Sequence, residues 1–174
     1  MRTIVLSLFF ASSAFAQSAP GVAMAPGCGA SNVTFSVTTK KNQHPFAQPD
    51  AGKALVYFLE DDLNFNARPK PTVRVGLDGT WVGATHGSSY FYFPVDAGQH
   101  HLCASWQGKG LEAYAAATDF SAKTGEMYFF VVRDTFWWPK GSDLIRKIDL
   151  ETVNGDEGQL LASKYSFSTS HAKN

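Results

Sequence analysis

Histidine is the residue type whose spacing most directly suggests chemistry here, because imidazole can bind zinc or transfer protons near neutral pH. His100 and His101 are adjacent, and His86 precedes them in a predicted loop. Adjacent residues on a strand point to opposite faces, so His100 and His101 cannot both bind one ion without distorting the strand. We therefore predict surface or hydrogen-bonded histidines, with no metal site and no cofactor. The other two histidines are His44 and His171.

Cys28 and Cys103 are the two cysteines of the sequence. In an exported chain they are expected to form a disulfide, which would close a loop of about 76 residues. Two buried free thiols are one alternative, and a nucleophilic Cys103 activated by His101 on the same strand face is another. A disulfide-bonded thiol cannot attack, and the sequence shows no Asn or Asp placed to orient His101. We predict the disulfide.

Acidic residues are weaker candidates for a site. Glu60, Asp61 and Asp62 follow an apolar run and would suit a hard cation if other oxygens converged, but no D-x-D-x-D-G loop follows. Asp61 and Asp62 are predicted to be solvated loop residues. The sequence contains no G-x-S-x-G, phosphate-binding loop or H-E-x-x-H motif. No catalytic residue is predicted, and a hydrolase or metal enzyme built on Glu60, His86 or His101 is kept as an alternative.

Trp137 and Trp138 are the best hint of a binding surface, because they lie in a predicted loop. Exposed aromatic rings can stack on sugars or anchor a partner protein. We favour the interpretation that one or both fold back and cap one end of the domain, since tryptophan is highly buried on average. A carbohydrate-binding module that uses Trp137 and Trp138 is the alternative. Trp81 and Trp106 lie in predicted strands and are assigned to the core.

The N-terminus has the features of a secretory signal peptide. A short apolar stretch ends at Ala14 and Ala16, which have the small-x-small spacing that signal peptidase accepts. We predict removal of residues 1–16 by cleavage between Ala16 and Gln17. A lipid anchor on Cys28 is the alternative, but an alanine stands where a lipobox needs a larger apolar residue. The exported protein would be periplasmic or extracellular.

The charge of the chain limits its partners. It contains 15 Lys and Arg against 15 Asp and Glu, and loss of Arg2 with the signal peptide would leave a formal charge of −1 (14 against 15). A near-neutral chain has no electrostatic grip on nucleic acid and no polybasic patch for anionic lipid. After removal of the signal peptide, the sequence has no apolar segment long enough to serve as a transmembrane helix.

The body of the chain predicts short strands separated by turns. Tyr90–Val95 and Glu126–Asp134 are apolar on both faces, so each must be covered on both sides inside a layered domain. Asp78 and Gly79 stand between two apolar runs and predict a tight hairpin, because this dipeptide accepts positive φ. Leu111–Asp119 is predicted as a strand, although its alanines suit a helix equally well. Further predicted strands are Val33–Thr38, Lys53–Glu60, Thr72–Leu77, Thr80–Ala84, Leu144–Leu150 and the one that ends at Gln107.

We expect about seven of these segments to form an all-β fold, an antiparallel β-sandwich that makes one domain over residues 31–170. Residues 17–30 are predicted as a flexible N-terminal segment and residues 171–174 as a frayed tail. Asp156–Lys164 predicts a short helix with acidic residues in its first turn. That helix could cover one sheet face, and a homodimer interface is the alternative cover for the same face.

Two segments of the sequence carry specific motifs. One is Leu-Asp-Gly-x-Trp-Val-Gly at residues 77–83, and the other is Gly-x-His-His-Leu-Cys-Ala-x-Trp-Gln at residues 98–107. They are similar to a bacterial exported family catalogued as domain of unknown function 2846, and the resemblance spans about Cys28 to Ser170. It implies a small transthyretin-like or PEGA-like β-sandwich and brings no activity, cofactor or catalytic residue. Many members resemble lipoproteins, whereas this chain lacks a convincing lipobox. Further similar blocks are Gly52–Phe58, Gly125–Val132 and Asp156–Tyr165.

The features above lead us to expect an exported bacterial envelope protein that acts as a non-enzymatic binding or structural module. Its expected partner is an envelope protein or a glycan, and a homodimer is an additional expectation. A fold by itself does not specify a ligand, so the function has to be argued from a site.

Overall fold

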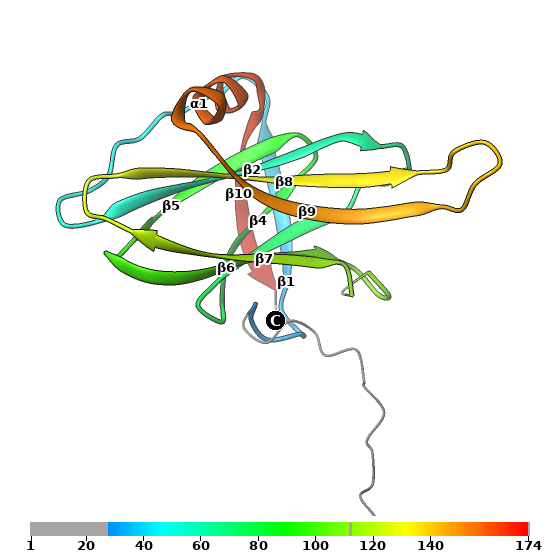
Figure 1. The fold of residues 1–174 in the computed structure, drawn as a ribbon, viewed down its shortest axis with the longest axis horizontal. Coiled ribbons are helices and arrows are strands. Elements are labelled where there is room, and N and C mark those ends of the chain that lie inside the picture. Colours follow the sequence, from blue (N-terminus) through cyan, green and yellow to red (C-terminus); the bar gives the residue numbers. More distant parts are fainter. Residues whose placement is uncertain (1–27, 112, 174) are drawn as a thin grey trace, which may run out of the picture.

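The computed structural model describes residues 28–111 and 113–173, so the predicted signal peptide and its cleavage site lie outside the described residues. Within this part of the chain, a six-stranded sheet packs face to face against a four-stranded sheet, and a helix lies on the outer face of the larger one (Figure 1). The predicted all-β sandwich with a short C-terminal helix is confirmed. The elements are β1 (Thr34–Lys40), β2 (Ala54–Phe65), β3 (Thr72–Leu77), β4 (Thr80–His86), β5 (Ser89–Val95), β6 (Gly98–Gln107), β7 (Ala115–Ala122), β8 (Met127–Trp137), β9 (Ile145–Val153), α1 (Gly155–Lys164) and β10 (Ser166–Lys173).

The strand order is β1-β10-β5-β2-β8-β9 in the larger sheet and β4-β3-β6-β7 in the smaller one. The larger sheet is mixed, because β2 pairs in parallel with β8 and β10 pairs in parallel with β5. The other pairs are antiparallel, including the predicted β3–β4 hairpin, in which Asp78 and Gly79 have φ of 50° and 80°. The strand expected at Leu111–Asp119 begins later, at Ala115.

The C-terminal tail is part of the larger sheet. The prediction that residues 171–174 fray is wrong as far as Lys173, because β10 continues to this residue and pairs with β1 from Thr34 to Lys40. A strand partner satisfies the backbone N–H and C=O groups of the tail, which its polar side chains alone could not do. The sequence predicts a strand at Val33–Thr38 but does not indicate the C-terminal strand that pairs with it.

Alternate residues of β2 point into two different cores. Val56 and Phe58 face the four-stranded sheet and belong to the cluster that contains the fully buried Trp106, as the sequence predicts for this tryptophan. Tyr57 and Leu59 face the other way and belong to a second cluster beneath helix α1. Burial on both sides explains why this strand is apolar at successive positions and confirms the layered arrangement expected for β5 and β8.

Helix α1 covers part of the outer face of the larger sheet. Asn154 caps its N-terminus by accepting a hydrogen bond from the Glu157 backbone N–H at 2.9 Å. Gly158 lies against Phe129 so closely that a Cβ atom would come within 2.3 Å of the ring. A further part of this face is covered by the loop after β1, where the Ala47 backbone hydrogen-bonds to the Tyr57 hydroxyl.

The first described residues lie across the outer face of the four-stranded sheet, where the predicted disulfide ties them. Cys28 and Cys103 are bonded, and their Cα atoms are 5.5 Å apart. Gly76 lies directly beneath, because a Cβ atom on it would be 2.1 Å from the Cys28 carbonyl oxygen. The Trp81 indole donates to the Ala30 carbonyl at 2.8 Å. Trp81 therefore packs on the outer face beneath this segment, and its assignment to the core is wrong.

Candidate functional site

The tip of the β8–β9 hairpin, residues 137–145, extends beyond the neighbouring strands (Figure 1, yellow to orange). Trp137 is 50 % exposed, Trp138 is 73 % exposed and Ile145 is 46 % exposed. The prediction that the tryptophans cap the sandwich end is therefore wrong. Trp137 still pairs with Ile145 in the β8–β9 hairpin, so both residues belong to the part of the hairpin that extends beyond the core.

The histidines of β6 are each hydrogen-bonded to a carboxylate. His100 Nδ1 lies 2.7 Å from Asp78 Oδ2 and its Nε2 lies 2.9 Å from the Asp96 carbonyl, so both nitrogens donate. Burial lowers the pKa of His100, but the hydrogen bonds and charges of Asp78 and Asp96 outweigh it and leave the pKa raised. His101 Nδ1 lies 2.7 Å from Asp119 Oδ1. These bonds hold the two imidazoles in place on the sheet.

The structure does not bring the five histidines together. His86 pairs with Thr72 at the start of β3, whereas His101 hydrogen-bonds to Asp78 just past the end of the same strand. His44 lies elsewhere, with its Nδ1 2.9 Å from the Tyr165 carbonyl. Among the described residues, no group of three or more His, Cys, Asp or Glu side chains is arranged to hold a metal ion.

The acidic segment of β2 is buried, and the prediction of solvated loop residues is wrong. Strand β2 continues through Glu60, Asp61 and Asp62, of which only 0 %, 9 % and 2 % is exposed. The strand alternation that turns Phe58 inward also turns Glu60 and Asp62 inward. Asp61 faces the outer side, where Arg133 Nη1 lies 2.7 Å from its Oδ2.

Glu60 meets a second buried carboxyl, Asp134 of β8, between the sheets. Burial raises the pKa of Glu60 well above its usual range, and the charge of Asp134 adds to the increase. Burial raises the pKa of Asp134 to about 7, although its hydrogen bonds with Trp106 and Glu60 oppose the change. Trp106 Nε1 donates to Asp134 Oδ1 at 2.6 Å. At neutral pH the two carboxyls therefore retain a proton in the interior.

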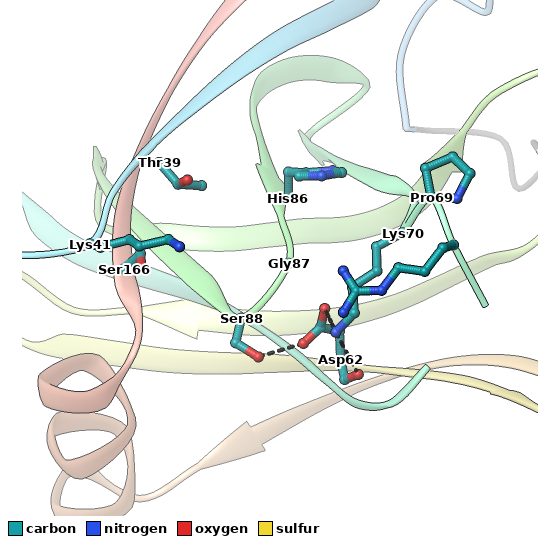
Figure 2. A pocket seen from close by; sticks show the side chains of 10 residues that line it. Thr39, Lys41, Asp62, Pro69, Lys70, His86, Gly87, Ser88 and Ser166 are labelled. Carbon is teal, nitrogen blue, oxygen red and sulfur yellow. Dashed lines mark hydrogen bonds and ion pairs between the residues drawn. The ribbon is translucent and has the colours of Figure 1, made fainter. Parts of the chain in front are cut away.

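A pocket of about 600 Å³ opens at this end of the sandwich, and we call it the end pocket (Figure 2). Asp62 lies at its wall, where it accepts a hydrogen bond from Ser88 Oγ at 2.5 Å and forms an ion pair with Lys70. Glu60 lies behind the wall and accepts a hydrogen bond from the Gly87 backbone N–H at 3.0 Å. The lining residues are Thr39, Lys41, Asp62, Arg68, Pro69, Lys70, His86, Gly87, Ser88 and Ser166.

Sequence reasoning missed most of the end pocket. Its wall combines Thr39, the loop before β3, the β4–β5 turn and Ser166, which are far apart in the chain. Asp62 and His86 are both candidate residues in the sequence, but nothing in their local patterns connects them. The signal that could have drawn attention was the pair of cations at Arg68 and Lys70 in a proline-containing loop.

Comparison of the chain with family models, with curated proteins and with solved structures finds no match. The resemblance to domain of unknown function 2846 stays a prediction from the sequence. Among the described residues, no helix is long and apolar enough to cross a membrane.

Proposed function

We propose that this chain is an exported, non-enzymatic binding module of the bacterial envelope, and that its hairpin tip binds carbohydrate through Trp137 and Trp138. The observation that carries the proposal is the exposure of the two indoles, 50 % and 73 %, at the end of a projecting hairpin. The predicted signal peptide and the Cys28–Cys103 disulfide support export, because disulfides persist in oxidising compartments.

The exposed indoles serve no packing role that the described residues reveal. Tryptophan offers a large rigid apolar face together with a polar N–H, which suits contact with a ligand that is half apolar and half polar. A sugar ring has this character, since its C–H face is apolar and its edge carries hydroxyl groups. Lys140 and Asp143 are exposed on the same tip and can hydrogen-bond to such hydroxyls.

The proposal is tested on a glycan array with the wild-type protein and the double variant Trp137→Ala/Trp138→Ala. We expect the double variant to lose at least about tenfold in binding, because truncating a central aromatic contact typically costs 2 kcal/mol or more. Leu160→Ala is the matched control, since Leu160 is a 53 % exposed apolar residue on helix α1, away from the hairpin. Glycan binding that survives in the double variant would remove the tip from the proposal.

An empty glycan array would contradict the carbohydrate part of the proposal. In that case, retention of a partner from envelope extract by the wild-type protein, and its loss in the double variant, would reassign the tip to protein binding. Equal recovery with both proteins would contradict the hairpin tip as the binding surface.

A further inference from the structure

The end pocket is a second place where a ligand could bind. Its lining carries charged side chains, whereas the hairpin tip presents aromatic ones. Loops and strand ends from distant parts of the chain surround it, and in layered folds such loop clusters are where binding residues gather. Its volume of about 600 Å³ falls within the range of small-molecule sites and is too small for a folded partner.

Asp62 and Lys70 give the pocket a fixed wall. Asp62 is 2 % exposed and is held by Ser88 Oγ at 2.5 Å and by the Lys70 ammonium. Lys70 Nζ also donates to the backbone carbonyl of Asp62 at 3.3 Å. The Lys70 side chain is 20 % exposed, so it is ordered by its partner while part of it still reaches the pocket. Asp62 neutralises the charge of Lys70, so Lys70 alone does not indicate an anion site.

Lys41 and Arg68 supply positive charge that no described residue balances through an ion pair. Both residues are exposed, both line the pocket, and neither forms an ion pair with another residue in the described part of the chain. Figure 2 shows Lys41 entering from one side, opposite Lys70 and Asp62. Three cationic side chains against one carboxylate leave two positive charges in excess when His86 is neutral. Like charges gathered around one concave site attract an anion of matching charge.

Neutral polar groups complete the site. His86 Nδ1 donates to the Pro71 carbonyl at 3.1 Å, so its Nε2 is the nitrogen that can contact a ligand. Thr39, Ser88 and Ser166 line the pocket with hydroxyl groups that can donate to anionic oxygens or accept from a hydroxylated ligand. The lining therefore offers ionic and hydrogen-bonding partners beside its apolar surface.

We propose that the end pocket binds a small organic dianion, a phosphate ester or a dicarboxylate, between Lys41, Arg68 and Lys70. Both ligand types carry about two negative charges at neutral pH, which equals the excess positive charge of the pocket. Arg68 can contact two oxygens of either group at once, whereas Lys41 contributes a mobile point charge. The proposal does not rest on carbohydrate binding at the hairpin tip.

Isothermal titration calorimetry tests the proposal with inorganic phosphate, glucose 6-phosphate and malate, and with glucose as the uncharged probe. We expect at least one dianion to bind and glucose not to bind, with affinity that falls as salt is raised. Arg68→Gln and Lys41→Gln should each weaken binding about tenfold or more, because each removes a charge-assisted contact. Comparing the affinities for phosphate and for malate shows which type of anion the pocket prefers, and either preference supports the proposal.

Lys123→Gln is the matched control, because it also removes one exposed positive charge. Lys123 lies in the β7–β8 turn, at the end of the sandwich where β2 begins and away from Asp62. It should bind as the wild type does. Lys41 and Arg68 are exposed, so unchanged thermal unfolding is expected for both variants and should be verified. Absence of binding by all three anions at 10 mM would overturn the proposal. Equal affinity in the wild type, Arg68→Gln and Lys41→Gln would also overturn it. So would glucose binding as tightly as glucose 6-phosphate.

Discussion

Replacing Asp134 with asparagine should make the stability of the protein less dependent on pH. Asp134 is 1 % exposed and accepts a hydrogen bond from Trp106 Nε1 at 2.6 Å, which an asparagine oxygen can also accept. The substitution therefore keeps the shape and the acceptor of the buried side chain and removes its ability to ionise. Glu60 stays in place, so the variant isolates one member of the buried carboxyl pair.

The size and sign of the effect follow from the pKa of Asp134. Burial raises this pKa from 3.8 to about 7, against the opposing hydrogen bonds from Trp106 and Glu60. Below pH 3.8 the carboxyl is protonated in both states, so its contribution to stability is fully present. As pH rises to about 7 the unfolded chain releases this proton first, and the wild type loses about 4 kcal/mol, at 1.36 kcal/mol per pKa unit. Asp134→Asn has no such loss.

Urea unfolding at pH 5 and pH 8, followed by tryptophan fluorescence, measures the effect. The free energy of unfolding of Asp134→Asn, relative to that of the wild type, should be higher at pH 8 than at pH 5. Asp50→Asn, an exposed carboxyl in the loop before β2, is the control and should keep the wild-type pH dependence. The reasoning is refuted if Asp134→Asn and the wild type lose the same free energy of unfolding between pH 5 and pH 8. Because Glu60 also titrates from a raised pKa, some pH dependence should persist in the variant.

Two further predictions concern the segment that covers the four-stranded sheet. Replacing Cys28 and Cys103 together by serine should lower the free energy of unfolding in urea by about 4 kcal/mol, the loop-closure value for a separation of 75 residues, and a loss below about 1 kcal/mol would contradict this. Gly76→Ala should cost about 1–3 kcal/mol, because its Cβ would stand 2.1 Å from the Cys28 carbonyl oxygen. The cost should shrink in the double-serine background, where the segment can move away. Gly155→Ala is the control, since the nearest atom to its Cβ is 3.9 Å away.

Much of the fold was accessible from local patterns. The tight β3–β4 turn follows from Asp78 and Gly79, which adopt the positive φ that their types allow. The apolar runs of β5 and β8 require cover on both faces whatever the exact neighbours are, and the structure supplies that cover with a second sheet on one side and the helix and loop on the other. The disulfide was expected from two cysteines in a chain whose N-terminus is predicted to be an export signal.

The candidate sites were much less accessible. The sequence assigned Trp81 to the core and favoured Trp137 folding back over the sandwich end. Trp81 instead lies under a covering segment, and Trp137 is 50 % exposed at the hairpin tip. Asp62 was expected to be a solvated loop residue, because the strand predicted from the sequence ended at Glu60, whereas β2 runs to Phe65. Pairing with β8 as far as Asp61, and again from Asn64, keeps β2 extended past Glu60, and strand alternation then turns Asp62 into the interior.

By itself, the sequence determined most of the strands, the tight β3–β4 turn and which two cysteines can bond, because turn geometry and alternation depend on neighbouring residues. It did not indicate β10, whose polar residues become a strand only by pairing with β1. The tertiary structure alone decided which polar and aromatic side chains are buried, exposed or brought together. The end pocket brings together Lys41, Asp62, Arg68 and Ser166 because β1, β10, β5 and β2 are consecutive strands of one sheet. Contacts of that kind depend on strand order and register, which no local pattern in the chain specifies.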